Sequence, residues 1–196
     1  VGCSVLYHLT KFGWSDVVLL ERSELTSGST WHAAGGMHTI NGDPNVAALQ
    51  KYTVDLYKEI QELSGQDIGL HMTGGVMLAA TPARFDWLKS IMAKGRYMGL
   101  DAQLITPNEA AELFPLMDPT QFVGALYDEV EGHLDPYGTT HAYAKSARKN
   151  GAEIELHTKV EELIRTPDGW RVVTNKGEIL AEHLVNAGGL WAREVG

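Results

Sequence analysis

The chain has 196 residues, of which 44% are apolar and 21% are charged, and its formal net charge is -9. This is the composition of an ordinary globular protein with enough apolar side chains for a sizeable core. The acidic balance and the lack of a basic cluster argue against nucleic acid and anionic membranes as partners. No apolar run approaches the roughly 20 residues that span a bilayer.

Cysteine occurs once, at Cys3, which excludes an internal disulfide and a cysteine-based metal site. We expect this side chain to be a small buried hydrophobe. The chain begins without methionine, inside a helical pattern, and lacks the charged-then-apolar order of a signal peptide. It stops at Gly196, just after another helical pattern. We therefore expect a segment of a longer protein.

The first predicted elements resemble half of a nucleotide-binding unit. Residues 2–12 have apolar side chains at helical spacing and predict a helix that ends at Gly13. Residues 16–21 form an apolar, valine-containing run, typical of a parallel strand covered on both faces. A helix, a turn and a strand that ends in an acid form the second half of a βαβ dinucleotide-binding unit. Gly2 lies where the last glycine of the unit's glycine-rich turn belongs, and Glu21 follows it by roughly 20 residues, the distance expected for the ribose-binding acid. Alternatively, Glu21 only ends a strand in solvent.

A stretch of small residues, 27–36, follows this strand and has the sequence SGSTWHAAGG. Small residues let a backbone approach a ligand closely, and we expect Ser29 or Thr30 to cap a helix whose N–H groups face an anion such as a diphosphate. The functional interpretation is a flavin pocket with His32 as the attachment point. The alternative is a tight turn that enters a buried helix, with His32 an ordinary, partly buried histidine.

The middle of the chain mixes short strands with capped helices. We predict a loop over 35–44 and then a helix over 46–63, whose apolar face consists of Leu49, Tyr52, Leu56, Ile60 and Leu63. Short strands are predicted over 68–71, 75–80 and 103–105. One further helix is capped by Thr81 and runs to about Met98, and another starts with the capping box of Thr106 and Glu109.

Strands and helices alternate again towards the end of the chain. We predict a strand over 121–127, a helix from Pro136 to Asn150 capped by Asp135, a strand over 154–156, an antiparallel meander over 159–165, 170–174 and 178–180, and a last strand over 183–186. The fold class is therefore α/β: a Rossmann-like nucleotide-binding domain without its first strand (1–65 and 134–196), for which the resemblance given below implies FAD, interrupted by part of an α+β substrate domain (66–133).

Three separated stretches carry a family resemblance. They are the strand at 17–22 leading into GSTWHAAG at 28–35, then GHLDPY at 132–137, and NAGGLWARE at 186–194. Together they resemble the dimethylglycine and sarcosine dehydrogenase family, within the larger group of D-amino-acid-oxidase-like FAD enzymes. The resemblance covers nearly the whole chain, and the STWHAAG stretch is its most specific part.

This resemblance implies a set of residues that bind FAD. In the family, the histidine matching His32 bonds covalently to the 8α-methyl carbon of the flavin, the acid matching Glu21 holds the adenosine ribose, and the backbone matching Val160 meets the adenine. The residues so implied are Val1, Gly2, Glu21, Arg22, Gly28, Ser29, Thr30, His32, Ala33, Ala34, Gly35, Val160, Gly188 and Trp191. For Trp191 the alternative is plain core packing.

The resemblance further implies an FAD-dependent amine dehydrogenase for dimethylglycine or sarcosine, with hydride transfer from the N-methyl carbon. It implies an electron acceptor such as electron-transfer flavoprotein, tetrahydrofolate in the full-length protein, and a cytoplasmic location in bacteria or a mitochondrial one in eukaryotes. The alternatives are an oxygen-using oxidase of amino acids or methylated amines, and a non-catalytic flavin-fold binding protein. His133 is a candidate catalytic residue, and because the histidines lack ligand spacing we expect no metal site.

Overall fold

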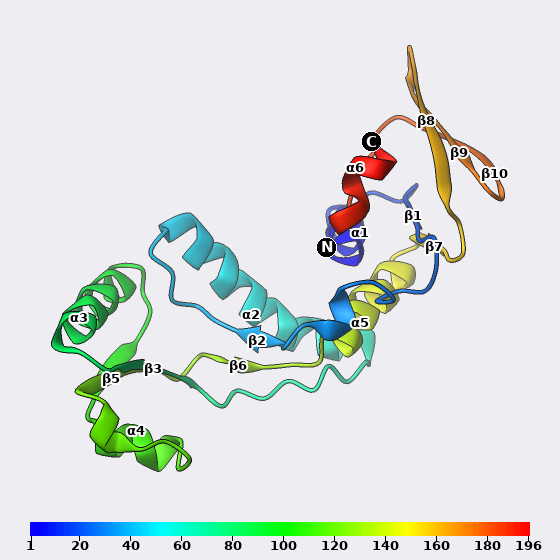
Figure 1. Cartoon of the computed structure of the whole chain (residues 1–196). Coiled ribbons are helices and arrows are strands. Elements are labelled where there is room, and N and C mark those ends of the chain that lie inside the picture. The colour runs from blue at the N-terminus through cyan, green and yellow to red at the C-terminus, as the bar shows by residue number, and fades with distance from the viewer. The chain divides into compact units, whose positions relative to one another are not determined.

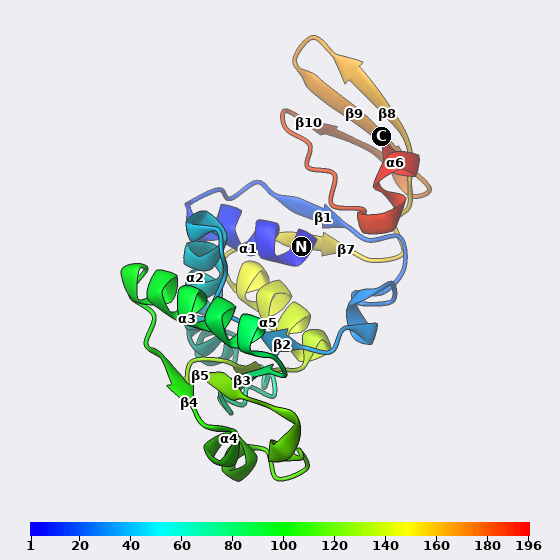
Figure 2. The same ribbon diagram turned by 60° about the vertical axis from the view of Figure 1, so that its left-hand side comes forward.

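The computed structural model describes residues 1–196, which divide into two compact units. Unit 1 comprises residues 1–33, 60–68 and 136–196, and unit 2 comprises residues 34–59 and 69–135. Figures 1 and 2 show the elements of each unit. The predicted domain boundaries at 65/66 and 133/134, with 66–133 as a substrate domain, stay a prediction.

Unit 1 is built on two packed helices and a parallel strand pair. Helix α1 (Gly2–Lys11) packs against α5 (Pro136–Lys149), as Figure 2 shows. The ring centres of Tyr7 and Tyr143 are 5.7 Å apart. Strand β1 (Val18–Leu20) pairs in parallel with β7 (Glu153–Glu155). Helix, turn and strand thus follow in the predicted order.

Cys3 lies on the buried face of α1, as predicted, with 7% of its surface exposed. Burial raises the pKa of the Cys3 thiol because the thiolate would lose its hydration. The side chain therefore behaves as a small hydrophobe rather than as a nucleophile.

The predicted meander forms the rest of unit 1. Strands β8 (Val160–Thr166), β9 (Gly169–Thr174) and β10 (Gly177–Ala181) make an antiparallel sheet in the order β10-β9-β8 (Figure 1). Gly177 has φ +136°, which the turn between β9 and β10 requires and a residue with a side chain rarely adopts. The chain ends in a short 3-10 helix (Gly189–Trp191) and α6 (Ala192–Val195).

Two predicted strands are wrong and one is shorter than expected. Residues 183–186 form no strand, and residues 68–71 contribute only an isolated bridge from His71 to His133. An extended apolar run becomes a strand only when a neighbouring strand accepts its hydrogen bonds. Strand β1 has three residues, and Val18 is 38% exposed, so the expected burial on both faces is absent.

Unit 2 contains a three-stranded antiparallel sheet between two helical layers. Strands β3 (Gly75–Ala79), β5 (Gly124–Asp128) and β4 (Ala102–Ile105) lie in the order β3-β5-β4. Helix α3 (Pro82–Tyr97) covers one face (Figure 1). Leu88 and Ile91 belong to one core cluster with Ala79, Ala102 and Leu126. Because side chains alternate along a strand, Val76 and Leu78 face the other side, near Phe114.

Both predicted helix caps of unit 2 are confirmed. Thr81 Oγ1 accepts a hydrogen bond from the N–H of Arg84 at 3.2 Å, at the start of α3. Helix α4 (Pro107–Leu113) begins with the capping box: Thr106 Oγ1 accepts from the N–H of Glu109 at 3.2 Å, and Glu109 Oε2 accepts from the N–H of Thr106 at 2.7 Å.

The long helix α2 (Pro44–Ser64) forms as predicted, but its buried face differs from the predicted one. Leu56 and Ile60 are buried, whereas Leu49 is 64% and Tyr52 is 44% exposed. Ala47 and Val54, which the prediction did not include, are buried in their place. The amphipathic pattern thus identified the helix without selecting the face that tertiary packing covers.

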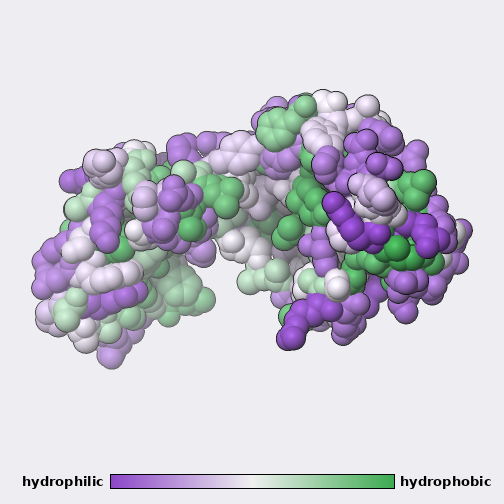
Figure 3. Space-filling model, turned by 90° about the horizontal axis from the view of Figure 1, so that it is seen from above, coloured by the Kyte–Doolittle hydropathy of each residue, from purple (hydrophilic) through white to green (hydrophobic).

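In Figure 3, hydrophilic residues are interspersed with apolar ones on the visible face of each unit. No helix combines the length and the apolar character that crossing a membrane requires.

Candidate functional site

Helix α1 begins at Gly2, and its first turn contains no acidic residue. The N–H groups and the positive end of the dipole at a helix N-terminus favour a phosphate. A Cβ built on Gly2 would contact Leu19 at 3.5 Å and Ala187 at 3.6 Å. These are ordinary contacts, so Gly2 lies where helix and strand pack closely but does not strictly require glycine.

Glu21 directly follows β1, the position predicted for the ribose-binding acid. Its Oε1 accepts a hydrogen bond from the N–H of Ser23 at 2.9 Å, and its own N–H donates to the carbonyl of Glu155 at 2.9 Å. The carboxylate is thereby oriented by the turn that follows the strand. Half-buried and oriented, it remains able to accept hydrogen bonds from a diol with its other oxygen.

Arg22 and Gly28 meet on the ring of Trp191. The guanidinium carbon of Arg22 lies 4.4 Å from the centre of this ring, a cation–π distance. A Cβ on Gly28 would approach the same indole at 3.3 Å. The three predicted residues, which are far apart in the sequence, are therefore neighbours in unit 1, where Trp191 braces the loop between Glu21 and Gly28.

His32 lies in a short 3-10 helix (Thr30–His32) rather than at the start of a long helix. Ser29 occupies the N-cap position, but neither its hydroxyl nor that of Thr30 caps the turn, so the predicted helix cap is wrong. The physical reason is backbone conformation: Ser29 has φ −76° and ψ −17°, which is helical, whereas a residue whose side chain caps a helix takes an extended conformation. The following helix, α2, begins only at Pro44.

The side chain of His32 is exposed and stacked on its neighbour. The ring centres of Trp31 and His32 are 3.7 Å apart with an interplanar angle of 36°. Trp31 is 59% exposed, and Ala33 and Ala34 are exposed as well. The turn therefore presents an aromatic, small-residue surface to solvent rather than entering a buried helix.

The remaining predicted cofactor residues lie at a strand and at a turn. Val160 is the first residue of β8, and a bulge follows it before Glu162. Gly188 lies in the turn before α6, where a Cβ would approach the backbone of Ala192 at 3.2 Å. Both therefore belong to unit 1.

Gly35 and His133 belong to unit 2. Strand β2 (Gly36–Met37) pairs with β6 (Gly132–His133), and the carbonyl of Gly35 accepts from the N–H of Leu134 at 3.0 Å. His133 also bridges to His71, and the two imidazoles stack with ring centres 5.0 Å apart. The predicted catalytic candidate is thus an exposed side chain on a short strand pair.

Sequence reasoning missed a histidine–carboxylate hydrogen bond next to the same strand pair. His38 Nδ1 lies 3.0 Å from Glu131 Oε2, although the two residues are 93 positions apart. No spacing rule connects them, because only the pairing of β2 with β6 brings them together. The only sequence signal for these two residues is their position, since His38 follows the stretch 28–35 and Glu131 precedes the stretch 132–137.

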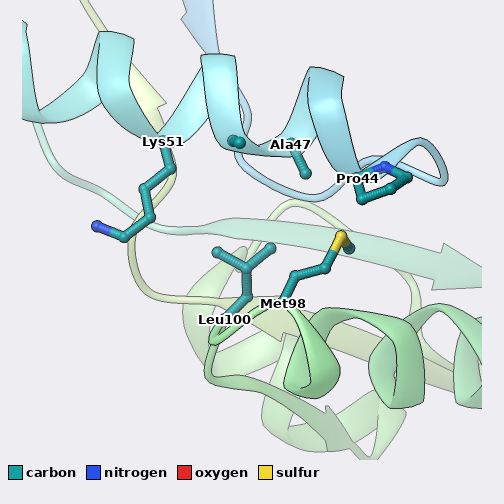
Figure 4. A pocket seen from close by; sticks show the side chains of 6 residues that line it. Pro44, Ala47, Lys51, Met98 and Leu100 are labelled. Atoms are coloured by element: carbon teal, nitrogen blue, oxygen red, sulfur yellow. The ribbon is translucent and has the colours of Figure 1, made fainter.

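Two pockets of unit 2 are lined by none of the predicted site residues. The first, of about 210 Å³, lies between α2 and the end of α3, where Met98 and Leu100 point towards Pro44 and Ala47 (Figure 4). Lys51 stands at its rim and pairs with Asp55 at 2.9 Å. The second, of about 390 Å³, lies on the sheet face beneath Phe114. No group of three or more His, Cys, Asp or Glu residues is arranged to hold a metal.

Comparison with known proteins agrees with this arrangement. The family described as FAD dependent oxidoreductase (DAO) matches residues 1–196. Dimethylglycine dehydrogenase of Mus musculus is 43% identical over the whole chain, and sarcosine dehydrogenase of Homo sapiens is 36% identical. L-proline dehydrogenase from P. horikoshii has a similar structure, with a TM-score of 0.92 and 29% identity over 100% of this chain and 52% of that one.

The chain spans only part of these relatives, 23% of the dimethylglycine dehydrogenase and 22% of the sarcosine dehydrogenase. The family match, however, extends from the first residue to the last. The chain belongs to the FAD dependent oxidoreductase family.

Proposed function

We propose that the protein is an FAD-dependent amine oxidoreductase that oxidises an N-methylated glycine derivative, dimethylglycine or sarcosine. The observation that carries this proposal is the exposed turn with stacked Trp31 and His32, which follows the acid-ended strand of a nucleotide-binding unit. The 43% identity to a dimethylglycine dehydrogenase supports the choice of substrate.

Residues of unit 1 would hold the cofactor. The N–H groups at the start of α1 would receive the diphosphate, Glu21 the ribose hydroxyls, and the turn around Gly28 to Ala33 the isoalloxazine. When bound, FAD supplies the two-electron acceptor that takes a hydride from the N-methyl carbon. The protein contributes by orienting the cofactor and the amine.

His32 would attach the flavin covalently. Forming this bond requires a nucleophilic ring nitrogen on a neutral imidazole. The exposed imidazole lies on Trp31, and no other side chain of the chain hydrogen-bonds its nitrogens. Nothing in unit 1 therefore has to be displaced before a nitrogen of His32 meets the flavin.

Denaturation of the flavin-loaded protein tests the attachment. We expect the yellow colour to precipitate with the polypeptide in acid, and to stay in the supernatant for His32→Ala, which removes the nucleophile. His183→Ala is the control, since His183 is an exposed histidine in edge contact with Trp14. Complete release of colour from the unaltered protein would refute covalent attachment.

Flavin bleaching under exclusion of oxygen tests the substrate. We expect dimethylglycine or sarcosine to bleach the flavin, and an artificial acceptor or electron-transfer flavoprotein to restore it. Rapid restoration by oxygen with peroxide release would instead identify an oxidase. No bleaching by any methylated amine would identify a binding protein. Tetrahydrofolate as a second cofactor, and a mitochondrial or bacterial cytoplasmic location, belong to the same proposal.

A further inference from the structure

The dipeptide Asn-Gly occurs twice in the chain, at 41–42 and at 150–151. In such a dipeptide the backbone nitrogen of glycine can attack the side-chain amide of asparagine, because glycine has no Cβ to obstruct the approach. This reaction needs no enzyme and is one reason why asparagine is a thermolabile residue. The surroundings of each asparagine decide whether the attack takes place in the folded protein.

The loop that precedes α2 leaves the backbone nitrogen of Gly42 available. Gly42 is exposed, and its N–H donates no hydrogen bond. Nothing lies within 4 Å of the position that a Cβ on Gly42 would occupy. The nitrogen can therefore lose its proton to water and move towards a neighbouring group without breaking a contact.

The side chain of Asn41 is held in the position that this attack requires. Its Oδ1 accepts a hydrogen bond from the N–H of Asp43 at 2.9 Å. The bond closes a side-chain turn that includes the nitrogen of Gly42, so the amide carbon of Asn41 is folded over the peptide that attacks it. The donor also draws electron density from the amide carbonyl, which makes the carbon a better electrophile.

The second dipeptide, which follows α5 in unit 1, is held differently. The N–H of Gly151 donates to the carbonyl of Arg148 at 3.0 Å, and Gly151 has φ +95°. The side-chain amide of Asn150 donates to Thr10 Oγ1 at 3.3 Å. An attack by the nitrogen of Gly151 would first have to break the hydrogen bond at the end of the helix and then the one to Thr10. The fold therefore protects Asn150.

We propose that Asn41 is a site of spontaneous chemical modification in the folded protein, through a succinimide that it forms with Gly42. The nitrogen of Gly42 loses its proton and bonds to Cγ of Asn41, the Cγ–Nδ2 bond breaks, and the amide leaves as ammonia. Water then adds to one of the two succinimide carbonyls and breaks a C–N bond of the ring. The products are aspartate and isoaspartate, and no oxidant or reductant is needed.

The two products affect the start of α2 differently. Asp43 caps this helix, since its Oδ1 accepts from the N–H groups of Asn45 at 2.8 Å and Val46 at 3.1 Å. Aspartate at position 41 keeps a side-chain oxygen for the N–H of Asp43. Isoaspartate carries the main chain through Cγ and lengthens it by one methylene, so the turn that positions Asp43 is lost. The first turn of α2 is then less well held.

Incubation of the folded protein at mildly alkaline pH, followed by peptide mapping with mass spectrometry, tests the proposal. We expect Asn41 to be converted about 10-fold or more faster than Asn150, since Gly151 must first break a hydrogen bond. In concentrated urea the fold no longer distinguishes the two dipeptides, so both should be converted at similar rates. Conversion should also quicken as the pH rises, because ring closure uses the deprotonated backbone nitrogen.

Gly42→Ala is the matched variant. Its Cβ has open space, so the variant keeps the fold and obstructs only the ring closure, and conversion at position 41 should be much slower. Hydrogen exchange measures the consequence for α2. Amides of residues 45–48 should exchange faster in the isoaspartate fraction, whereas Asn41→Asp, which reproduces the other product, should keep their protection.

Three results would overturn the proposal. The first is equal conversion of Asn41 and Asn150 in the folded protein, or an unreacted Asn41 under conditions that convert it in urea. The second is a difference between the two sites that persists in urea, since flanking residues rather than the fold would then decide the rate. The third is an unchanged rate in Gly42→Ala, which would exclude ring closure through this nitrogen.

Discussion

Single residues at close contacts decide how the short strands of unit 2 meet. Gly132 lies in β6, and a Cβ there would approach the carbonyl oxygen of His71 at 2.1 Å. His71 and His133 exchange two backbone hydrogen bonds, of 2.9 Å and 3.0 Å, across this contact. The absence of a side chain at Gly132 therefore allows the bridge that brings the two imidazoles together.

We predict that Gly132→Ala destabilises the protein by about 1–3 kcal/mol, because the added methyl group must displace backbone rather than a flexible side chain. Urea unfolding measures the change. The control is Gly42→Ala, where nothing lies within 4 Å of the new Cβ and a change within about 0.5 kcal/mol is expected. Equal unfolding midpoints for the two variants would contradict the close contact.

At the scale of one element, α4 shows how local sequence fixes a boundary. The backbone hydrogen bond from Thr106, followed by the one from its hydroxyl, holds the pKa of Glu109 below its usual value. Both favour the charged carboxylate, and the N-terminus of the helix favours it as well. The stabilisation of α4 by the capping box therefore depends on pH.

We predict that α4 loses this support in acid. The folded pKa of Glu109 lies below the unfolded value of about 4.3, so its contribution is complete above that value and is lost as the pH falls through the folded pKa. Glu109→Gln keeps an accepting oxygen but cannot titrate, so its urea midpoint should fall less between pH 5 and pH 3 than that of the unaltered protein. Glu112→Gln in the last turn of α4 is the control, and an identical pH response of the two variants would refute the assignment.

At the scale of the whole molecule, the chain forms two units that each have a buried core. Leu126, which is 1% exposed, packs with Leu88 and Ile91 in unit 2, whereas Leu6 and Tyr7 of α1 are buried in unit 1. The chain passes between the units several times, because residues 60–68 belong to unit 1 and residues on either side belong to unit 2. Each core is therefore assembled from separate parts of the sequence.

We predict that Leu126→Ala costs about 2–5 kcal/mol of unit 2 stability, since it leaves a cavity in a packed core. Hydrogen exchange should accelerate in β3, β5 and α3, while amides in α1 and α5 keep their protection. Leu116→Ala, at a side chain that is 89% exposed, should change neither. Equal acceleration in both units would show that they unfold as one.

The sequence by itself determined the local elements and the family. Periodicity and caps located α1, α3, α4 and α5 to within a few residues, because helix formation depends on neighbours three or four positions apart. The stretch around His32 identified an FAD enzyme, which the family match confirms. Its covalent role remains a prediction.

Tertiary structure alone decided the long-range contacts. Three features depend on partners that are distant in the sequence. Leu49 of α2 is exposed, residues 183–186 form no strand, and Arg22 contacts Trp191. The same holds for His38 and Glu131, which only the register of β2 on β6 makes neighbours. A sequence pattern states what a segment can bury or bond, but which partner it meets is set by the packing of the whole unit.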